Sequence, residues 1–223
     1  MITSKLKALV LASSIFISHQ VLATENYNTE IPPSIMTPDT VQTSIGELNF
    51  KDGAPTAETA QKLYDNLDTL RSTEVFLNAI PMASVEALRL GHIELGSKSS
   101  NQVVVFDKLM DSNPLFLTGN TDTVYASVFL DLEKDGPTVI EVPEGMGPTT
   151  VNDAFFRFVT DLGIVGPDKG KGGKYLILPP GYEGEVPEGY FVSQSTSYTN
   201  WFIARGFLKD GKTDAAMKAY KEK

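Results

Sequence analysis

The chain has 223 residues, a formal net charge of −9, no cysteine and two histidines. A chain of this size buries roughly 70% of the surface of its unfolded state, enough for one large domain or two small ones. Its acidic balance disfavours nucleic acid and anionic membrane surfaces as partners, because both are negatively charged. Without cysteine there is no disulfide and no thiol-based catalytic or metal site.

Residues 1–23 have the pattern of a secretory signal peptide. Lys5 and Lys7 give the positive start, residues 8–17 the apolar middle, and residues 21–23 a small-residue cleavage site. This apolar stretch of ten residues is too short to span a bilayer as a helix. We therefore expect cleavage after Ala23, a periplasmic or secreted location and no membrane span in the mature chain; an uncleaved anchor is the alternative. Removal of the signal leaves 17 bases against 28 acids, a net charge of −11.

The first part of the mature chain is predicted to be an arm followed by two helices. Residues 24–54 contain three prolines and no sustained period, which predicts an extended arm with at most a short strand over 43–50. Pro55 and Thr56 are typical of a helix start. Apolar residues then recur at helical spacing, at Leu63, Leu67, Leu70 and Leu77. Pro81 is expected to divide this region into helices over 56–79 and 83–95.

From residue 101 onward short β-branched runs alternate with turns rich in glycine and proline. The predicted strands cover residues 103–106, 123–132, 138–142, 151–159, 175–178, 190–192 and 200–208. An Asp-Gly pair at 135–136 between two of these runs predicts a hairpin. The fold class is therefore α+β, with a short helical N-terminal pair before a mainly antiparallel β-sandwich or jelly-roll-like part over 101–208. Together they form one domain, residues 55–210, and 211–223 begin a continuation.

Several segments of the β-rich part occur in an order that resembles the N-terminal part of the Domain of Unknown Function 1254 family. They are residues 118–127, 131–132, 139–143, 153–158, 166–182, 189–190 and 200–206. The resemblance runs from about residue 31 to residue 223. It implies an envelope or secreted protein and no defined reaction. Family members usually continue into a second β-rich domain, Domain of Unknown Function 1214, so the resemblance also implies a truncated, split or short form.

The remaining residue types exclude several kinds of catalytic site. His92 is the one histidine after residue 23, so a site that needs two histidine ligands is absent. Because His92 shares a predicted helical face with Val85 and Leu88, a packed histidine is favoured over a catalytic base. Residues 131–136 lack the closing carboxylate of a calcium loop, and residues 166–173 lack the spacing of a phosphate-binding loop. Both are interpreted as turns, and no metal or cofactor is expected.

Six residues remain as candidates for a ligand-binding site at one end of the sheet. They are Asn120, Asp122, Tyr125, Asp153, Arg157 and Arg205. Asp122 and Asp153 would form a carboxylate pair, with an arginine lowering the pKa of one. The favoured interpretation is that both arginines form structural ion pairs, as arginines in apolar strands usually do.

Two functions remain open at this point. The first is a non-catalytic binding or assembly module, whose partner is a separately encoded second domain or a second copy. The second is an envelope hydrolase that uses carboxylate and arginine chemistry on a small or sugar-like molecule. We also expect an apolar face near the C-terminus that needs a partner, because a helix from Asp214 to Lys223 is too short to be stable alone.

Overall fold

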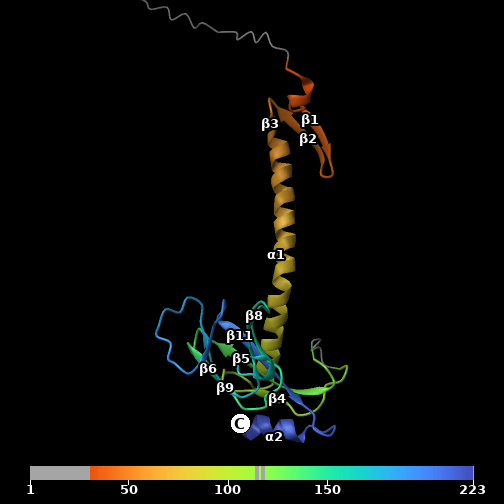
Figure 1. Ribbon diagram of the computed structural model, residues 1–223. Helices are drawn as coiled ribbons and strands as arrows, with labels where there is room; N and C mark the ends of the chain where they lie inside the picture. The colour runs from red at the N-terminus through yellow and green to blue at the C-terminus, as the bar shows by residue number, and fades with distance from the viewer. Residues whose placement is uncertain (1–30, 114–115, 117–118, 223) are drawn as a thin grey trace, which may run out of the picture. The chain divides into compact units, whose positions relative to one another are not determined.

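The computed structural model describes residues 31–113, 116 and 119–222 (Figure 1). The predicted signal peptide, residues 1–23, and the start of the predicted arm, residues 24–30, lie outside the described residues. The chain divides into two compact units whose boundary falls between Asp65 and Asn66. That boundary lies within helix α1, which runs from Ala57 to Glu94. Each unit is described by itself.

The first unit contains a small antiparallel sheet and the start of α1. A 3-10 turn (Pro33–Ile35) precedes the strands β1 (Thr40–Thr43), β2 (Gly46–Lys51) and β3 (Ala54–Pro55). The single strand predicted over 43–50 is therefore one side of a hairpin, turned at Gly46, whose φ of 100° suits glycine. Thr56, at the predicted helix start, caps α1, because the Thr59 N–H donates to Thr56 Oγ1 at 3.2 Å.

The predicted pair of helices is wrong, because α1 is one continuous helix with Pro81 inside it. A proline in a helix removes one backbone hydrogen bond and costs about 3 kcal/mol. Ala79 precedes Pro81, and Met82 and Ala83 follow it; alanine and methionine are strong helix formers. The helix therefore continues through the proline to Glu94, and Gly96, with φ of 100°, follows its end.

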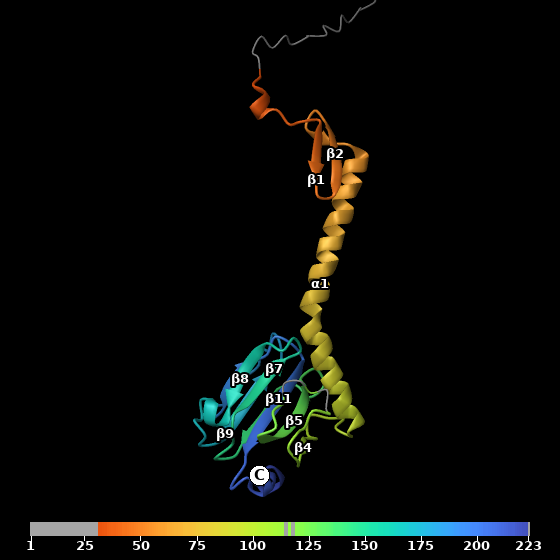
Figure 2. The ribbon, with the colours of Figure 1, turned by 90° about the vertical axis from the view of Figure 1, so that its right-hand side faces the viewer.

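The second unit is built on a five-stranded antiparallel sheet in the order β4-β5-β11-β7-β8 (Figure 2). The strands are β4 (Val104–Phe106), β5 (Thr123–Asp131), β11 (Thr199–Phe207), β7 (Thr149–Asp153) and β8 (Phe158–Leu162). Most of the predicted strands are confirmed. The run predicted as one strand over 151–159 instead supplies parts of β7 and β8, joined by a tight turn.

A second sheet contains β6 (Thr138–Val142), β9 (Gly173–Leu178) and β10 (Phe191–Gln194), with β9 and β10 parallel. The predicted hairpin at Asp135-Gly136 is wrong, since β5 and β6 belong to different sheets. An apolar strand is compatible with either sheet, so the pattern of β5 and β6 does not require them to pair with each other. The turn at Asp135-Gly136 instead connects the two sheets. The 3-10 turn η2 (Gly163–Val165) precedes β9.

The five-stranded sheet buries both of its faces. One face contributes Ala126, Val128 and Leu130 to the main core, together with residues of the second sheet. The other places Phe129 and Trp201 against Val85 of α1, as the alternation of side chains along a strand requires. The fold is thus α+β; its description as a sandwich or jelly roll stays a prediction.

Helix α2 (Asp214–Glu222) packs at the end of this sheet formed by the start of β5 and the end of β11. Its Ala216 and Met217 are buried in a cluster with Val124. Gly206 of β11 leaves room for the helix, because a Cβ there would lie 2.7 Å from Ala216 Cβ. Within the described residues, no helix combines the length and apolar character needed to cross a membrane.

Candidate functional site

Four of the six candidate residues lie together where β5 begins. Asn120 Oδ1 accepts hydrogen bonds from the backbone N–H groups of Asp122 and Thr123, at 3.0 and 2.9 Å, and thereby fixes the turn that enters β5. The Asn120 N–H donates to the hydroxyl of buried Tyr125 at 2.8 Å. The guanidinium of exposed Arg205 lies 5.9 Å from the Tyr125 ring centroid, a cation–π contact.

The other two candidates form a second cluster at the turn between β7 and β8. Asp153 is 1% exposed, and its Oδ1 accepts the backbone N–H groups of Phe155 and Arg157, both at 2.8 Å. Its Oδ2 accepts the Arg157 Nε–H at 2.7 Å and the Thr196 hydroxyl at 2.6 Å. Burial by itself would raise the pKa of Asp153, but these hydrogen bonds outweigh it and hold the pKa below its ordinary value.

These bonds hold the turn in a strained conformation. Phe156 has a φ of 62°, which is rare for a bulky side chain and persists only where neighbouring contacts enforce it. Its ring lies 5.7 Å from that of Trp201. The Asp153–Arg157 ion pair is therefore structural, in agreement with the favoured interpretation of Arg157.

The two clusters do not converge, so the prediction that the six residues meet at one end of the sheet is wrong. In the register of β11, Asn200 pairs with Asp153 and Arg205 pairs with Tyr125. Five residues along a strand span about 16 Å. Asp122 and Asp153 are consequently too far apart to act as the carboxylate pair of a glycosidase. Whether either cluster contacts a ligand stays a prediction.

A third polar group, which sequence reasoning did not assemble, lies between α1 and the sheet. The Ser127 hydroxyl oxygen lies 2.8 Å from His92 Nε2 and 2.7 Å from Trp201 Nε1. The indole N–H only donates, so Ser127 accepts from it. His92 Nδ1 lies 2.8 Å from the carbonyl oxygen of Leu88, which only accepts. The imidazole proton is therefore on Nδ1, and the Ser127 hydroxyl donates to Nε2.

This arrangement has the bonding pattern of a serine nucleophile and its base, but it is closed. Ser127 is 1% exposed and His92 is 6% exposed, and the ring of Phe129 meets the imidazole edge-on at 5.1 Å. No substrate reaches an oxygen that is enclosed in this way. Burial lowers the pKa of His92, against a smaller opposing effect of its bond to Leu88, so the neutral imidazole is favoured. The interpretation of His92 as a packed, hydrogen-bonded residue is confirmed.

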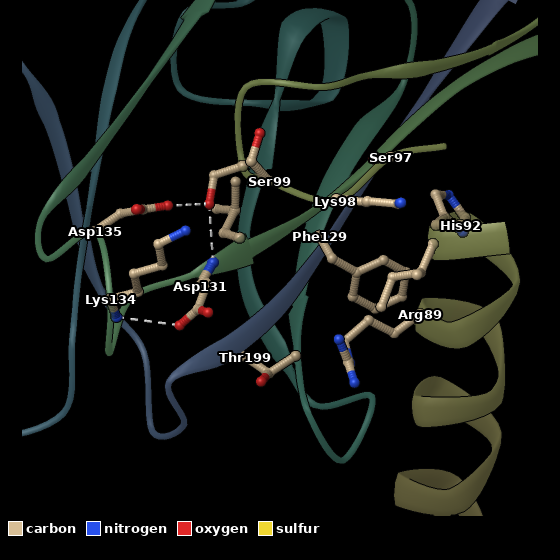
Figure 3. A pocket seen from close by; sticks show the side chains of 13 residues that line it. Arg89, His92, Ser97, Lys98, Ser99, Phe129, Asp131, Lys134, Asp135 and Thr199 are labelled. Atoms are coloured by element: carbon tan, nitrogen blue, oxygen red, sulfur yellow. Dashed lines mark hydrogen bonds between the residues drawn. The ribbon is translucent and has the colours of Figure 1, made fainter. Parts of the chain in front are cut away.

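We call Ser127, His92 and Trp201 the Ser127 triad. An open pocket of about 90 Å³ lies beside it and includes His92 in its lining; we call it the β5-end pocket (Figure 3). Arg89 and His92 of α1 line one side of it, and the turn after β5 lines the other. Ile93, Phe129 and Leu130 supply its apolar wall. The remaining lining residues are polar: Ser97, Lys98, Ser99, Ser100, Asp131, Lys134, Asp135 and Thr199.

The acids of the β5-end pocket are engaged in hydrogen bonds. Asp131 Oδ1 accepts the backbone N–H of Lys134 at 3.1 Å. Ser100 links the two sides of the turn, because its hydroxyl donates to Asp135 Oδ2 at 2.5 Å and accepts the Asp131 N–H at 3.0 Å. The turn is thus held by its own carboxylates.

The cations of the same pocket differ in how far they are paired. Arg89 donates to both carboxylate oxygens of Glu86 at 2.7 Å, and this bond holds the pKa of Glu86 below its ordinary value. The ammonium groups of Lys98 and Lys134 have no hydrogen bond or ion pair with any residue of the described part of the chain. Two unpaired cations beside serine and threonine hydroxyls suit an anionic group of a small ligand.

The glycine-rich loop over residues 166–173, which was interpreted as a turn, is held by its own carboxylate. Asp168 is buried in the glycine-rich loop and accepts the Tyr175 hydroxyl and the Gly172 N–H, the latter at 3.0 Å. A carboxylate thus occupies the place that a phosphate would need. Across residues 31–113, 116 and 119–222, no group of three or more His, Asp or Glu side chains is arranged to hold a metal ion.

Comparison with known families decides the family of the chain. The model of the family described as "Protein of unknown function (DUF1254)" matches residues 100–223. The chain belongs to this family. The matched region begins at Ser100 of the β5-end pocket and includes both candidate clusters, Ser127 and Trp201, whereas Arg89 and His92 precede it.

A solved structure shows a distant likeness. It is the crystal structure of the VPA0106 protein from Vibrio parahaemolyticus, with 16% sequence identity and a TM-score of 0.47 over 64% of this chain. The match spans 33% of that protein's length, so the chain corresponds to about a third of it. No curated protein sequence matches the chain significantly.

The β5-end pocket was missed because its residues are separated in sequence. Arg89, Lys98 and Lys134 belong to three segments that only the packing of α1 on β5 brings together. One signal was present: the polar run Ser97-Lys98-Ser99-Ser100 follows the end of a helix in a chain of net charge −9. Such a run is also typical of an ordinary solvated loop, and therefore indicates no site by itself.

Proposed function

We propose that this DUF1254 protein is an exported, non-catalytic binding module whose β5-end pocket takes a small molecule through an anionic group, a carboxylate or a phosphate. The observation that carries the proposal is a pair of lysines in an acidic chain, Lys98 and Lys134, which line the β5-end pocket and have ammonium groups without a partner among the described residues. A cavity of about 90 Å³ has room for such a group together with a few atoms around it.

A binding role is favoured over hydrolysis because the groups with catalytic potential are already committed. Ser127 and His92 are enclosed with Trp201, and every oxygen of the Asp153 carboxylate has partners within the chain. The hydrolase alternative needs two carboxylates at a common site, and Asp122 and Asp153 lie in different clusters. No observation on the described residues favours it.

Export belongs to the same proposal. It rests on the pattern of residues 1–23. N-terminal sequencing of protein recovered from the periplasm should give Thr24 as the first residue. Intact Met1 in that fraction contradicts export with cleavage.

Ligand binding is tested by thermal unfolding with inorganic phosphate and with acetate as probes. We expect each bound probe to raise the melting temperature, because a ligand that binds only the folded state stabilises it. The double variant Lys98→Gln, Lys134→Gln should lose this rise. Lys174→Gln is the matched control, since Lys174 is an exposed lysine of β9 outside the β5-end pocket. An equal rise in the double variant contradicts the proposal.

A further inference from the structure

The middle of α1 exposes more apolar surface than a solvated helix tolerates. Leu67, Leu70 and Leu77 are 36%, 60% and 58% exposed. Val75 and Phe76 between them are 67% and 69% exposed. An apolar stripe on a helix is normally buried against another element, and among the described residues no hydrophobic cluster includes any of these five.

The exposed leucines follow the spacing of a coiled-coil seam. Leu67, Leu70, Glu74 and Leu77 are separated by three, four and three residues, the spacing of alternating a and d positions. We call these four residues the α1 seam. Val75 and Phe76 occupy b and c positions, on the side of the helix away from the α1 seam.

The charges on this segment indicate the direction of a partner helix. Glu74 occupies a core position of the α1 seam, and Arg71 flanks it. They are three residues apart on one helix, yet the described structure gives neither a hydrogen bond nor an ion pair. A parallel second copy would bring two Glu74 carboxylates together at one layer, which repels. An antiparallel copy brings each Glu74 to Arg71 of the other chain.

We propose that α1 pairs with α1 of a second copy of this chain, antiparallel, through the α1 seam. Leu67 of one copy packs on Leu77 of the other, and Leu70 packs against the aliphatic part of Glu74. The Glu74 carboxylate then binds Arg71 across the pair, so the one polar core residue fixes direction and register, a role that polar residues play in coiled coils. The occupant of the exposed face is thus the chain itself.

Matched substitutions distinguish pairing through the α1 seam from nonspecific association of exposed apolar side chains. Leu70→Asp and Val75→Asp each place a charge on an exposed apolar site of the same helix. Sedimentation velocity over a range of concentrations should show a dimer for the natural chain and for Val75→Asp. Leu70→Asp should dimerise about tenfold more weakly or worse, equivalent to about 1.4 kcal/mol. A natural chain that stays monomeric at all concentrations, or equal losses in both variants, overturns the proposal.

Charge reversal tests the direction. Arg71→Glu and Glu74→Arg should each weaken the dimer, and the double variant should restore it, because the cross-chain pair is then reversed rather than removed. Circular dichroism should show unchanged helix content in all three, so a weaker dimer does not reflect unfolding. Failure of the double variant to recover any affinity contradicts the pairing of Arg71 with Glu74.

Cysteine cross-linking gives an independent reading of direction, and the natural chain has no cysteine to interfere. Leu70→Cys mixed with Glu74→Cys should give a disulfide-linked heterodimer under mild oxidation. Each variant alone should cross-link less, because in an antiparallel pair residue 70 faces residue 74. Dominant self-cross-linking of Leu70→Cys indicates a parallel pair and overturns the proposal.

Discussion

Two polar groups, one at the end of β7 and one beyond the end of β5, show opposite relations to the rest of the chain. Asp153 is enclosed, and both of its oxygens accept hydrogen bonds from the β7–β8 turn and from Thr196. Lys98 and Lys134 at the β5-end pocket are exposed, and within the described residues their ammonium groups have no partner. The first group therefore contributes to the free energy of folding, while the second is free to contribute to binding. This distinction is what the sequence alone does not provide, because both groups are simply charged residues beside strands.

Removal of the enclosed Asp153 carboxylate is the strongest test of its contribution to the free energy of folding. Asp153→Ala leaves two backbone N–H groups and the Arg157 side chain without their acceptor, and it releases the strain held at Phe156. We expect a loss of about 3 kcal/mol in the free energy of unfolding. Urea denaturation measures it. Arg157→Met is the control and should cost much less, because the Arg157 side chain is 60% exposed.

The Ser127 triad is expected to behave like Asp153 rather than like the lysines. Ser127→Ala removes the acceptor of the Trp201 indole N–H and the donor to His92 in a site without water access. The expected loss is about 2 kcal/mol of unfolding free energy. A variant as stable as the natural chain would show that the triad is not part of the folding core.

The buried imidazole of the Ser127 triad should make the free energy of unfolding depend on pH. Burial lowers the pKa of His92 in the folded chain, so the unfolded chain binds the proton more readily. The stabilising contribution of the neutral imidazole is then complete above the unfolded pKa of about 6.5 and is lost as the pH falls below it. The difference between the unfolding free energies at pH 7.5 and at lower pH should be smaller in His92→Gln than in the natural chain. An unchanged pH slope in that variant assigns the dependence to other groups.

Much of the fold follows from local pattern, and the site does not. The strands β5 and β9 were predictable because each contains a mainly apolar run beside turn residues, and β11 was predictable from the alternation of its side chains. The pairing of β6 with β9 instead of β5 was not predictable, because the apolar pattern of a strand does not specify which other strand it pairs with. The same holds for Pro81, where flanking helix formers override a residue that ends most helices.

The candidate residues illustrate the same limit on a smaller scale. Asp153 and Arg157 were singled out as candidate ligand-binding residues, yet a separation of four residues lets them form an ion pair with each other within a turn. Arg89 and Lys134 meet at the β5-end pocket only because α1 packs on β5, a contact between segments more than forty residues apart. Hydrophobic spacing located the elements, but only the tertiary packing decides which polar groups remain free.

The smallest expected effect on folding is the most informative about binding. Lys98→Gln with Lys134→Gln should change the free energy of unfolding by less than about 0.5 kcal/mol in the absence of added anions, because both side chains are exposed and unpaired. Inorganic phosphate at low ionic strength should stabilise the natural chain and leave the double variant unaffected. Added sodium chloride should reduce the stabilisation, since salt screens exposed charges beyond about 10 Å at 0.1 M. Denaturation curves of both proteins with and without phosphate provide the comparison. If the double variant is destabilised as strongly as Asp153→Ala, the two lysines hold the fold rather than a ligand, and the distinction between the two groups fails.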